Sequence, residues 1–268
     1  VGAIFAMLIF VMVLSIYVTS YVPSQMTIYE QEYSARLSDS LENLASAIFT
    51  LIEEDRNGSS LITTFNLESE NVPFFTSPTY GLLNFSSNGQ REGKISLTLD
   101  GSGSNLPHKF TVGGAASVVS NNRYFIDEMF TFEFSSVFFN RVMTDNTSYL
   151  TAGLVSSNSS NWIDLTLVNI IYVPNEISSS STVPIMVTFI NETIQPFKGI
   201  SIIAFNYDTS LYGQSFYQSV SDSLNNSGLT NNFPVSTLDY QNGAWQFTIS
   251  STSSNCVVTN ASIEISLV

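Results

Sequence analysis

The sequence predicts an α+β protein, with a long N-terminal hydrophobic helix followed by a β-sandwich-like, mainly antiparallel head. Two observations carry this prediction. An apolar run opens the chain at Val1–Val18, and the first charged residue after it is Glu30. From Ser59 onward the hydrophobic period changes from that of a helix to the alternation typical of strands. We therefore expect a helix over residues 1–56 and a head over residues 57–268, with a candidate subdomain boundary at 173–182.

The apolar run is long enough to cross a bilayer as a helix, since about 20 apolar residues suffice for this. A secretory signal would need a basic flank before the run and a cleavage site after it. The sequence shows neither, and the helical pattern continues past Ser20. We therefore expect that the chain is processed immediately before Val1 and that the apolar helix remains in the mature protein.

The second half of the expected helix is amphipathic. Its acidic residues, among them Glu30, Glu32 and Asp39, fall mainly outside an apolar stripe with the spacing of one helical face. The stripe consists of Tyr29, Tyr33, Leu37, Leu41, Leu44, Ile48, Leu51 and Ile52. Pro23 removes a backbone donor and disfavours helix at Val22, so we expect a kink or a short unwinding there. We expect the helix to end at Arg56–Gly58, with Gly58 near the C′ position.

Short strands are expected in the head, separated by segments rich in Gly, Ser, Asn and Pro. The expected strands are 61–65, 95–99, 109–112, 123–132, 137–142, 163–172, 183–190, 200–206, 245–250 and 263–268. A second helix is expected near Tyr212–Leu224, where Phe216, Val220 and Leu224 recur every four residues. The repeated strands predict a sandwich.

The composition excludes several classes of function. The formal net charge is −14, yet only 11% of the residues are charged. The eight basic residues are scattered, whereas nucleic-acid binding needs a basic patch, so we expect no nucleic-acid partner. The single cysteine, Cys256, and the single histidine, His108, exclude an intrachain disulfide framework and a cysteine-rich zinc site.

Sequons for N-glycosylation are dense in the head. All of them follow the apolar segment, which fits a head that faces outward, although some sequons arise by chance in a chain so rich in Asn and Ser. The candidate acceptors are Asn57, Asn84, Asn146, Asn158, Asn191, Asn225 and Asn260.

The remaining candidate sites favour structural roles. His108 has no Ser and Asp partners at a triad spacing, and Asp100–Asn105 resembles a calcium loop less than a hairpin turn. Cys256 is interpreted as a buried apolar residue. The acidic residues at 53–55 oppose the helix dipole, which a basic neighbour in an assembly would explain. The aromatic stretch at 124–139 is interpreted as core, with a carbohydrate-binding surface as the alternative. We expect no enzyme activity, no cofactor and no metal.

The N-terminal region resembles that of a mature archaeal type IV pilin. The resemblance lies in Val1-Gly2-Ala3 with the apolar run, in Pro23, and in the amphipathic half that follows. Two stretches of the head, 77–85 and 113–125, resemble the long ectodomains of archaeal pilin-like proteins. Bacterial pilins carry a glutamate at the fifth mature position, where this chain has Phe5. The resemblance therefore favours an archaeal filament without a salt bridge from residue 5 to a neighbour's amino terminus.

The resemblance implies a structural subunit of an extracellular pilus for adhesion or surface attachment. The implied partners are further copies of the chain, a prepilin peptidase, an assembly ATPase with its platform, and the membrane before assembly. The implied filament core comprises Val1, Gly2, Ala3, Phe5, Ala6, Leu8, Ile9, Phe10, Val13, Leu14 and Tyr17. Two alternatives remain open, namely an archaellum-type filament subunit and a membrane-anchored binding protein with a β-rich head.

Overall fold

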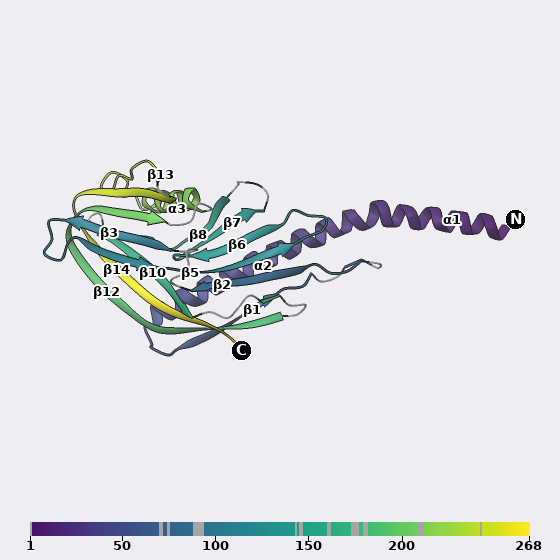
Figure 1. Ribbon diagram of the computed structural model, residues 1–268, viewed down its shortest axis with the longest axis horizontal. Helices are drawn as coiled ribbons and strands as arrows, with labels where there is room; N and C mark the ends of the chain where they lie inside the picture. Colours follow the sequence, from purple (N-terminus) through teal and green to yellow (C-terminus); the bar gives the residue numbers. More distant parts are fainter. Residues whose placement is uncertain are drawn as a thin grey trace.

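A long N-terminal helix projects from a β-rich head in the computed structural model of the chain (Figure 1). The structure describes residues 2–69, 72–73, 76–87, 94–142, 144, 147–159, 162–172, 177–178, 182–207, 212–241 and 243–268. Within these residues the helix is followed by two mostly antiparallel sheets and one short helix. The α+β class and the order of helix and head are therefore confirmed.

The N-terminal helix is continuous over 53 residues, Gly2–Glu54. It comprises α1 (Gly2–Ile16), a π-helical turn (Tyr17–Tyr21) and α2 (Val22–Glu54). The N–H of Val22 donates to the carbonyl of Tyr17, five residues back, which is the π-helical pattern. Because Pro23 cannot donate a bond to the preceding turn, a wider turn just before it accommodates the ring. Val22 keeps helical angles (φ −60°, ψ −51°), and the irregularity of the helix is the π-helical turn that precedes it.

The helix ends earlier than the sequence predicts. Asp55 takes the left-handed conformation (φ 44°, ψ 45°) directly after Glu54, a role that we expected Gly58 to fill. A short polar side chain such as Asp tolerates this conformation better than most residues do. Gly58 lies in the next turn with φ 81°, where its N–H donates to the carbonyl of Phe189 (2.8 Å) and starts a strand pairing.

The larger sheet contains eight of the described strands in the order β4-β3-β12-β14-β10-β9, with β1 beside β12 and β13 beside β14. Among these described strands, β10 and β14 pair in parallel and the other pairs are antiparallel. The bounds are β1 Ser60–Asn66, β3 Ile95–Gly101, β4 His108–Val112, β9 Val155–Ser159, β10 Trp162–Tyr172, β12 Thr182–Tyr207, β13 Asp239–Gln241 and β14 Ala244–Leu267.

The smaller sheet contains six of the described strands in the order β11-β2-β5-β6-β7-β8, all of them antiparallel. The bounds are β2 Tyr80–Ser87, β5 Gly114–Asn121, β6 Glu128–Glu133, β7 Ser136–Arg141, β8 Thr147–Ala152 and β11 Ile177–Ser178. The expected strand over 123–132 begins only at Glu128, because the preceding residues form a loop against the N-terminal helix.

Two pairs of predicted short strands are single long strands. The predictions 183–190 and 200–206 both lie in β12, and the predictions 245–250 and 263–268 both lie in β14. Register shifts near Phe189, Phe197 and Ile200 interrupt the regular pairing of β12 with β14. Such bulges bend a strand without ending it, so the polar and Gly-containing stretch between the predicted strands does not become a loop.

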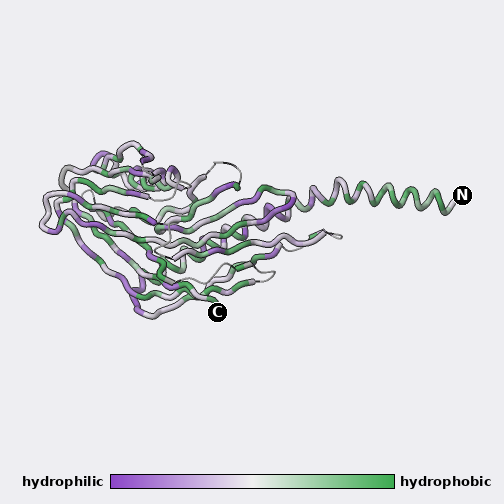
Figure 2. Tube along the Cα trace, in the orientation of Figure 1, coloured by the Kyte–Doolittle hydropathy of each residue, from purple (hydrophilic) through white to green (hydrophobic). Residues whose placement is uncertain are grey.

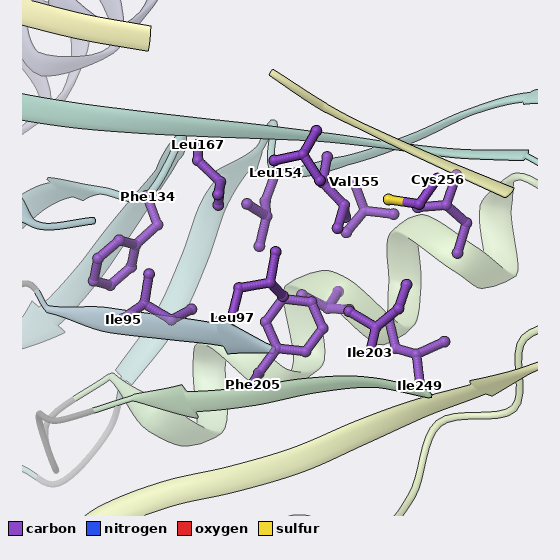
Figure 3. Packing of buried hydrophobic residues seen from close by; sticks show 14 of the residues in the cluster. Ile95, Leu97, Phe134, Leu154, Val155, Leu167, Ile203, Phe205, Ile249 and Cys256 are labelled. Carbon is purple, nitrogen blue, oxygen red and sulfur yellow. The ribbon is translucent and has the colours of Figure 1, made fainter. Parts of the chain in front are cut away.

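The described residues of the head form two hydrophobic clusters. The α2 cluster packs the apolar stripe of α2 between the two sheets, with Phe85 and Phe132 of the smaller sheet and Ile263 of the larger one. The α3 cluster surrounds the short helix α3 (Gly213–Asn226) and contains Phe205, Ile249 and Cys256 (Figure 3). Both β12 and β14 contribute residues to both clusters. The expected subdomain boundary at 173–182 falls largely on residues 173–176 and 179–181, which lie outside the described residues.

Two buried polar pairs connect β6 to the region of α3. The hydroxyl of Tyr207 donates to the carboxylate of Glu133, and the hydroxyls of Thr131 and Tyr212 lie 2.9 Å apart. Burial raises the pKa of Tyr212 well above its usual range, and the Glu133 charge adds to this effect. Buried polar groups that find partners in this way avoid the cost of lost hydration, so these pairs orient the segments that they join.

Gly213 begins α3 under the indole ring of Trp245, and this contact gives a testable prediction. A Cβ atom at residue 213 would lie 1.8 Å from Cδ1 of Trp245, so the ring would have to move. Alanine favours a helix over glycine by about 1 kcal/mol. The clash outweighs this gain, and we expect Gly213→Ala to lower the free energy of unfolding by about 1–3 kcal/mol.

Urea-induced unfolding in detergent, followed by tryptophan fluorescence, measures this change. Gly2→Ala is the matched control, because a Cβ atom there meets nothing within 4 Å. Equal stabilities of the two variants would show that the close approach of Gly213 to Trp245 does not affect the free energy of unfolding.

Candidate functional site

The most distinctive surface of the chain is helix α1. The structure describes all of α1, and none of its side chains is buried. Ile4, Phe5 and Phe10 are 69%, 66% and 65% exposed. Figure 2 shows that the projecting helix is coloured mainly from white to green toward its N-terminus, while hydrophilic segments lie on the head. Apolar surface of this kind costs about 25 cal/mol per Å² in water, so α1 requires either lipid or another protein around it.

The predicted filament-core residues lie together on this projecting segment. Tyr17 lies in the π-helical turn and stacks on Tyr21 with ring centroids 5.2 Å apart. Val1 lies outside the described residues. The exposed residues of this group are Gly2, Ala3, Phe5, Ala6, Leu8, Ile9, Phe10, Val13 and Leu14. Among the described residues, one helix, Gly2–Glu54, is long and apolar enough to cross a membrane.

The apolar stripe of α2 fixes this projecting helix to the head. Tyr33, Leu37, Leu41, Leu44, Ile48 and Leu51 of the predicted stripe are buried, while Tyr29 and Ile52 are half-buried. Burying one large apolar side chain contributes about 1.5–3 kcal/mol, so the stripe anchors α2 strongly between the sheets. Because α1 continues α2 without a break in the helix, the exposed apolar rod is attached directly to the core of the head.

Glu30 is the functional residue that the sequence reasoning missed. We expected it outside the buried stripe, but its side chain is fully buried. One carboxylate oxygen accepts the N–H of Arg123 (3.0 Å), and the other accepts those of Tyr124 (2.7 Å) and Phe125 (2.8 Å). Three backbone donors converging on one carboxylate form a strong anion site of the kind seen in backbone nests. The position of Glu30, one turn before Tyr33, was the available signal.

The loop that Glu30 holds connects β5 to β6 and comprises residues 122–127. Its first residue, Asn122, closes it internally: the backbone N–H of Asn122 donates to Asp127 (2.5 Å) and its side chain donates to the carbonyl of Ile126 (2.9 Å). The Thr27 hydroxyl, which donates to the carbonyl of Pro23 in its own helix (2.9 Å), also lies 3.4 Å from the carbonyl oxygen of Tyr124. These bonds place the β5–β6 loop against α2, beside the point where the helix leaves the head (Figure 1).

The candidate glycosylation sites are distributed over the surface of the head. Asn57, Asn84, Asn191 and Asn225 are exposed, whereas Asn260 is half-buried in β14 and its Oδ1 atom is enclosed. Asn146 lies outside the described residues, and so does the side chain of Asn158. Exposure makes the first four the sterically open acceptors.

The other candidate sites take structural positions. The ring of His108 packs against Phe110 and Phe197, with centroids 4.6 and 5.2 Å apart. Asp100 lies in β3, which pairs with β4 in the antiparallel hairpin that we expected there. The acidic residues at 53–55 are exposed at the helix end, and the Asp55 charge adds to the burial that raises the pKa of Glu192. Within the described residues no group of three His, Cys, Asp or Glu side chains could hold a metal.

Cys256 lies in the α3 cluster and is predicted to be unreactive in the folded head. Burial, and to a lesser degree the nearby Asp164 carboxylate, raise the pKa of its thiol far above the usual range. Because the thiolate is the reactive form, a maleimide should label the folded protein slowly at neutral pH and the urea-unfolded protein quickly. Labelling at equal rates in the two states would contradict the buried position.

Comparison of the chain with protein-family models, with curated proteins and with solved structures finds no match. The architecture is pilin-like in shape, with a hydrophobic N-terminal helix and a β-rich head. The helix is consistent with a pilin core or a membrane anchor, and it suggests membrane or secretory targeting.

Proposed function

We propose that this chain is a structural subunit of an extracellular filament of the archaeal type IV pilus kind, which serves adhesion or surface attachment. One observation carries the proposal: an uncharged, fully exposed helix continues without a break into a helix buried in the head. A flexible anchor would need no such rigid connection. A rod fixed to a head, in contrast, allows repeated packing in one orientation.

In the proposed assembly pathway the apolar helix has two successive roles. The helix first holds the precursor in the membrane, where a prepilin peptidase processes it. An assembly ATPase and its platform move the subunit out of the lipid, where neighbouring α1 helices cover one another. A contact between two different surfaces of identical subunits produces an open helical filament when its rotation does not close a ring. The heads then form the outer surface, with glycans at exposed sequons.

The proposed core is built from side chains that allow close helix packing. Gly2, Ala3 and Ala6 are small, and small residues let helix backbones approach each other. Phe5 stands where a carboxylate would pair with a neighbour's amino terminus, so apolar contacts set the stacking register instead. Glu53 and Glu54, exposed at the other end of the helix, offer charges to a basic group of a neighbouring head.

Shearing of cells that make the full chain tests this proposal. We expect the sheared supernatant to contain filaments by electron microscopy, and we expect purified filaments to consist of this chain. If the protein stays in detergent-extractable membranes and no filaments are released, the subunit proposal is wrong.

A membrane-anchored protein with a β-rich head is the second candidate, because the helix Gly2–Glu54 is also long and apolar enough to remain in a bilayer. The shearing experiment separates the two, since an anchor stays with the membrane. An archaellum subunit would also be sheared off as filaments. Loss of swimming in a deletion strain would favour the archaellum, whereas loss of attachment with normal swimming would favour the pilus.

A further inference from the structure

The uncharged helical segment Gly2–Ile28 is longer than the hydrocarbon core of a bilayer is thick. From Gly2 to Ile28 the helix rises about 39 Å, at about 1.5 Å per residue. A bilayer is about 30 Å thick in its hydrocarbon region and about 40–45 Å thick with its headgroup layers. Ile28 is still 46% exposed, and the first charge, Glu30, is buried in the head. A helix that spans from Gly2 therefore brings Thr27–Glu30 to the outer headgroup layer.

The β5–β6 loop lies at this same level of the helix. Glu30 accepts the backbone N–H groups of three successive residues, 123–125, and the Thr27 hydroxyl one turn earlier lies 3.4 Å from the carbonyl oxygen of Tyr124. Because three bonds converge on the single buried carboxylate of Glu30, they fix the position of the loop along the helix. Figure 1 shows the connection between β5 and β6 beside the emerging helix.

The exposed side chains of this loop have the chemistry of a membrane interface. Tyr124 is 44% exposed and Ile126 is 46% exposed, and Arg123 is exposed beside them. Nearer the apolar rod, Tyr21 is 52% exposed and stacks on Tyr17. Tyrosine side chains gather at membrane–water interfaces, where the ring meets the acyl boundary and the hydroxyl meets water. An arginine at this depth can bind headgroup phosphates through its planar guanidinium.

We propose that Arg123, Tyr124 and Ile126 form a membrane-docking site that seats the head on the phospholipid headgroup layer before assembly. The site rests on the membrane-held stage of the proposed function. Arg123 contacts phosphate oxygens, while Tyr124 and Ile126 enter the layer beside the helix. In a chain with a net charge of −14, a cation at this level offsets the repulsion between an acidic head and anionic lipids.

Lipid fits this surface better than a second copy of the chain does. The surface is continuous with the membrane-length helix, and it combines one cation with an interfacial aromatic and a single aliphatic residue. A second copy of the chain would offer carboxylates to Arg123 but no continuation of the apolar helix, and burial of the loop against that copy is the competing outcome of the test.

Fluorophore labels at single cysteines in full-chain proteoliposomes test the proposal. The background is Cys256→Ala, and the labelled variants are Phe10→Cys for the rod, Tyr124→Cys for the loop and Tyr240→Cys for the outer head. Tyr240 is the matched control, since it is an exposed tyrosine (49%) on β13. Quenchers are brominated lipids carrying bromine near the headgroup or near the acyl-chain end, and iodide in the water. Ile126→Cys provides a second loop position that keeps Tyr124.

We expect shallow bromolipids to cause the larger loss of emission at residue 124 and deep bromolipids to cause the larger loss at residue 10. Residue 240 should lose emission only to iodide. Arg123→Ser should reduce the shallow quenching at 124 and leave the deep quenching at residue 10 unchanged.

Three results would overturn the docking site in distinguishable ways. Deep quenching at residue 10 without lipid quenching at 124 or 126 refutes the site and leaves the membrane stage standing. Protection of 124 from both lipid and iodide shows that a second copy covers the loop. Absence of lipid quenching at residue 10 overturns the membrane stage itself, and with it the site.

Discussion

Phe10→Asp is expected to abolish filament formation and to leave the head folded. Phe10 lies in the middle of α1 and is 65% exposed, so the single chain loses no internal packing when it is replaced. In the proposed filament the same position is enclosed by neighbouring helices. An unpaired carboxylate buried in an apolar environment carries a large desolvation penalty, which the contacts around one residue cannot offset. The measurement is the yield of sheared filaments by electron microscopy and immunoblot.

Two control variants test whether the loss of filaments comes from a charge at residue 10. Phe10→Leu keeps an apolar side chain and should assemble, and Tyr240→Asp places the same charge on an exposed aromatic of the outer head and should also assemble. The head of Phe10→Asp should keep the native β-rich circular dichroism and resistance to proteolysis. A normal filament yield from Phe10→Asp would remove α1 from the filament core.

The membrane fraction separates two causes of a missing filament. An Asp at the centre of a membrane helix costs about 2.5–3.5 kcal/mol on insertion scales, which is a modest penalty against the long apolar run around it. We therefore expect Phe10→Asp to remain in the membrane. Loss of the protein from membranes would mean that insertion, and not polymer packing, is what the substitution disrupts. Leu14→Asp, nearer the end of the run, then provides the better test of packing.

Glu30→Ala is expected to destabilise the head by about 3–5 kcal/mol, because three hydrogen bonds from backbone N–H groups to one charged acceptor are lost together. The substitution leaves three backbone donors, those of residues 123–125, without their acceptor. Bonds to charged groups each contribute about 1.5–3 kcal/mol, so even partial hydration of the loop leaves a large loss. Urea-induced unfolding of the full chain in detergent measures the change.

Glu32→Ala is the matched control, because Glu32 is exposed on the same helix two residues away. Its effect should lie within about 0.5 kcal/mol, as for most surface substitutions. Hydrogen exchange adds a local measurement: the amides of residues 123–125 should exchange much faster in Glu30→Ala than in Glu32→Ala. Similar stability and exchange in the two variants would show that the Glu30 carboxylate does not hold the loop.

A further substitution, Glu30→Gln, tests whether Glu30 also positions the docking site. If Glu30 sets the height of the β5–β6 loop along the helix, Glu30→Gln should weaken the shallow lipid quenching at residue 124, since an amide presents an N–H group to donors that need an acceptor. Residue 10 should remain deeply quenched. This outcome would assign Glu30 a positioning role for the docking site in addition to its role in stability.

The periodic parts of the chain were predictable. The stripe from Tyr33 to Leu51 identifies the buried face of α2 because each member lies one helical turn from the next. Helix α3 was found in the same way, from Phe216, Val220 and Leu224. Local irregularities of the helix backbone were less predictable. The sequence does not indicate which residue takes the left-handed conformation at the end of the helix, here Asp55. It also does not indicate that the irregularity at Pro23 takes the form of a π-helical turn.

The role of Glu30 could be derived only in part from periodicity. Its position one turn before Tyr33 places it on the buried face of the helix, but a carboxylate is expected in water unless something binds it. What binds it is the backbone of residues 123–125, more than 90 positions away in the chain. Backbone donors carry no side-chain signature, so no residue pattern in that loop indicates the contact.

The sequence by itself determined the order of the molecule: an uncharged apolar segment, an amphipathic helix and a strand-rich head. These follow from the kind and the spacing of side chains, which act within a few residues. Only the tertiary structure decided that β12 and β14 each run through both clusters, that Glu30 is buried, and that the β5–β6 loop lies beside the emerging helix. Each of these arises from contacts between distant segments, where pairing and burial are set by the whole packed head.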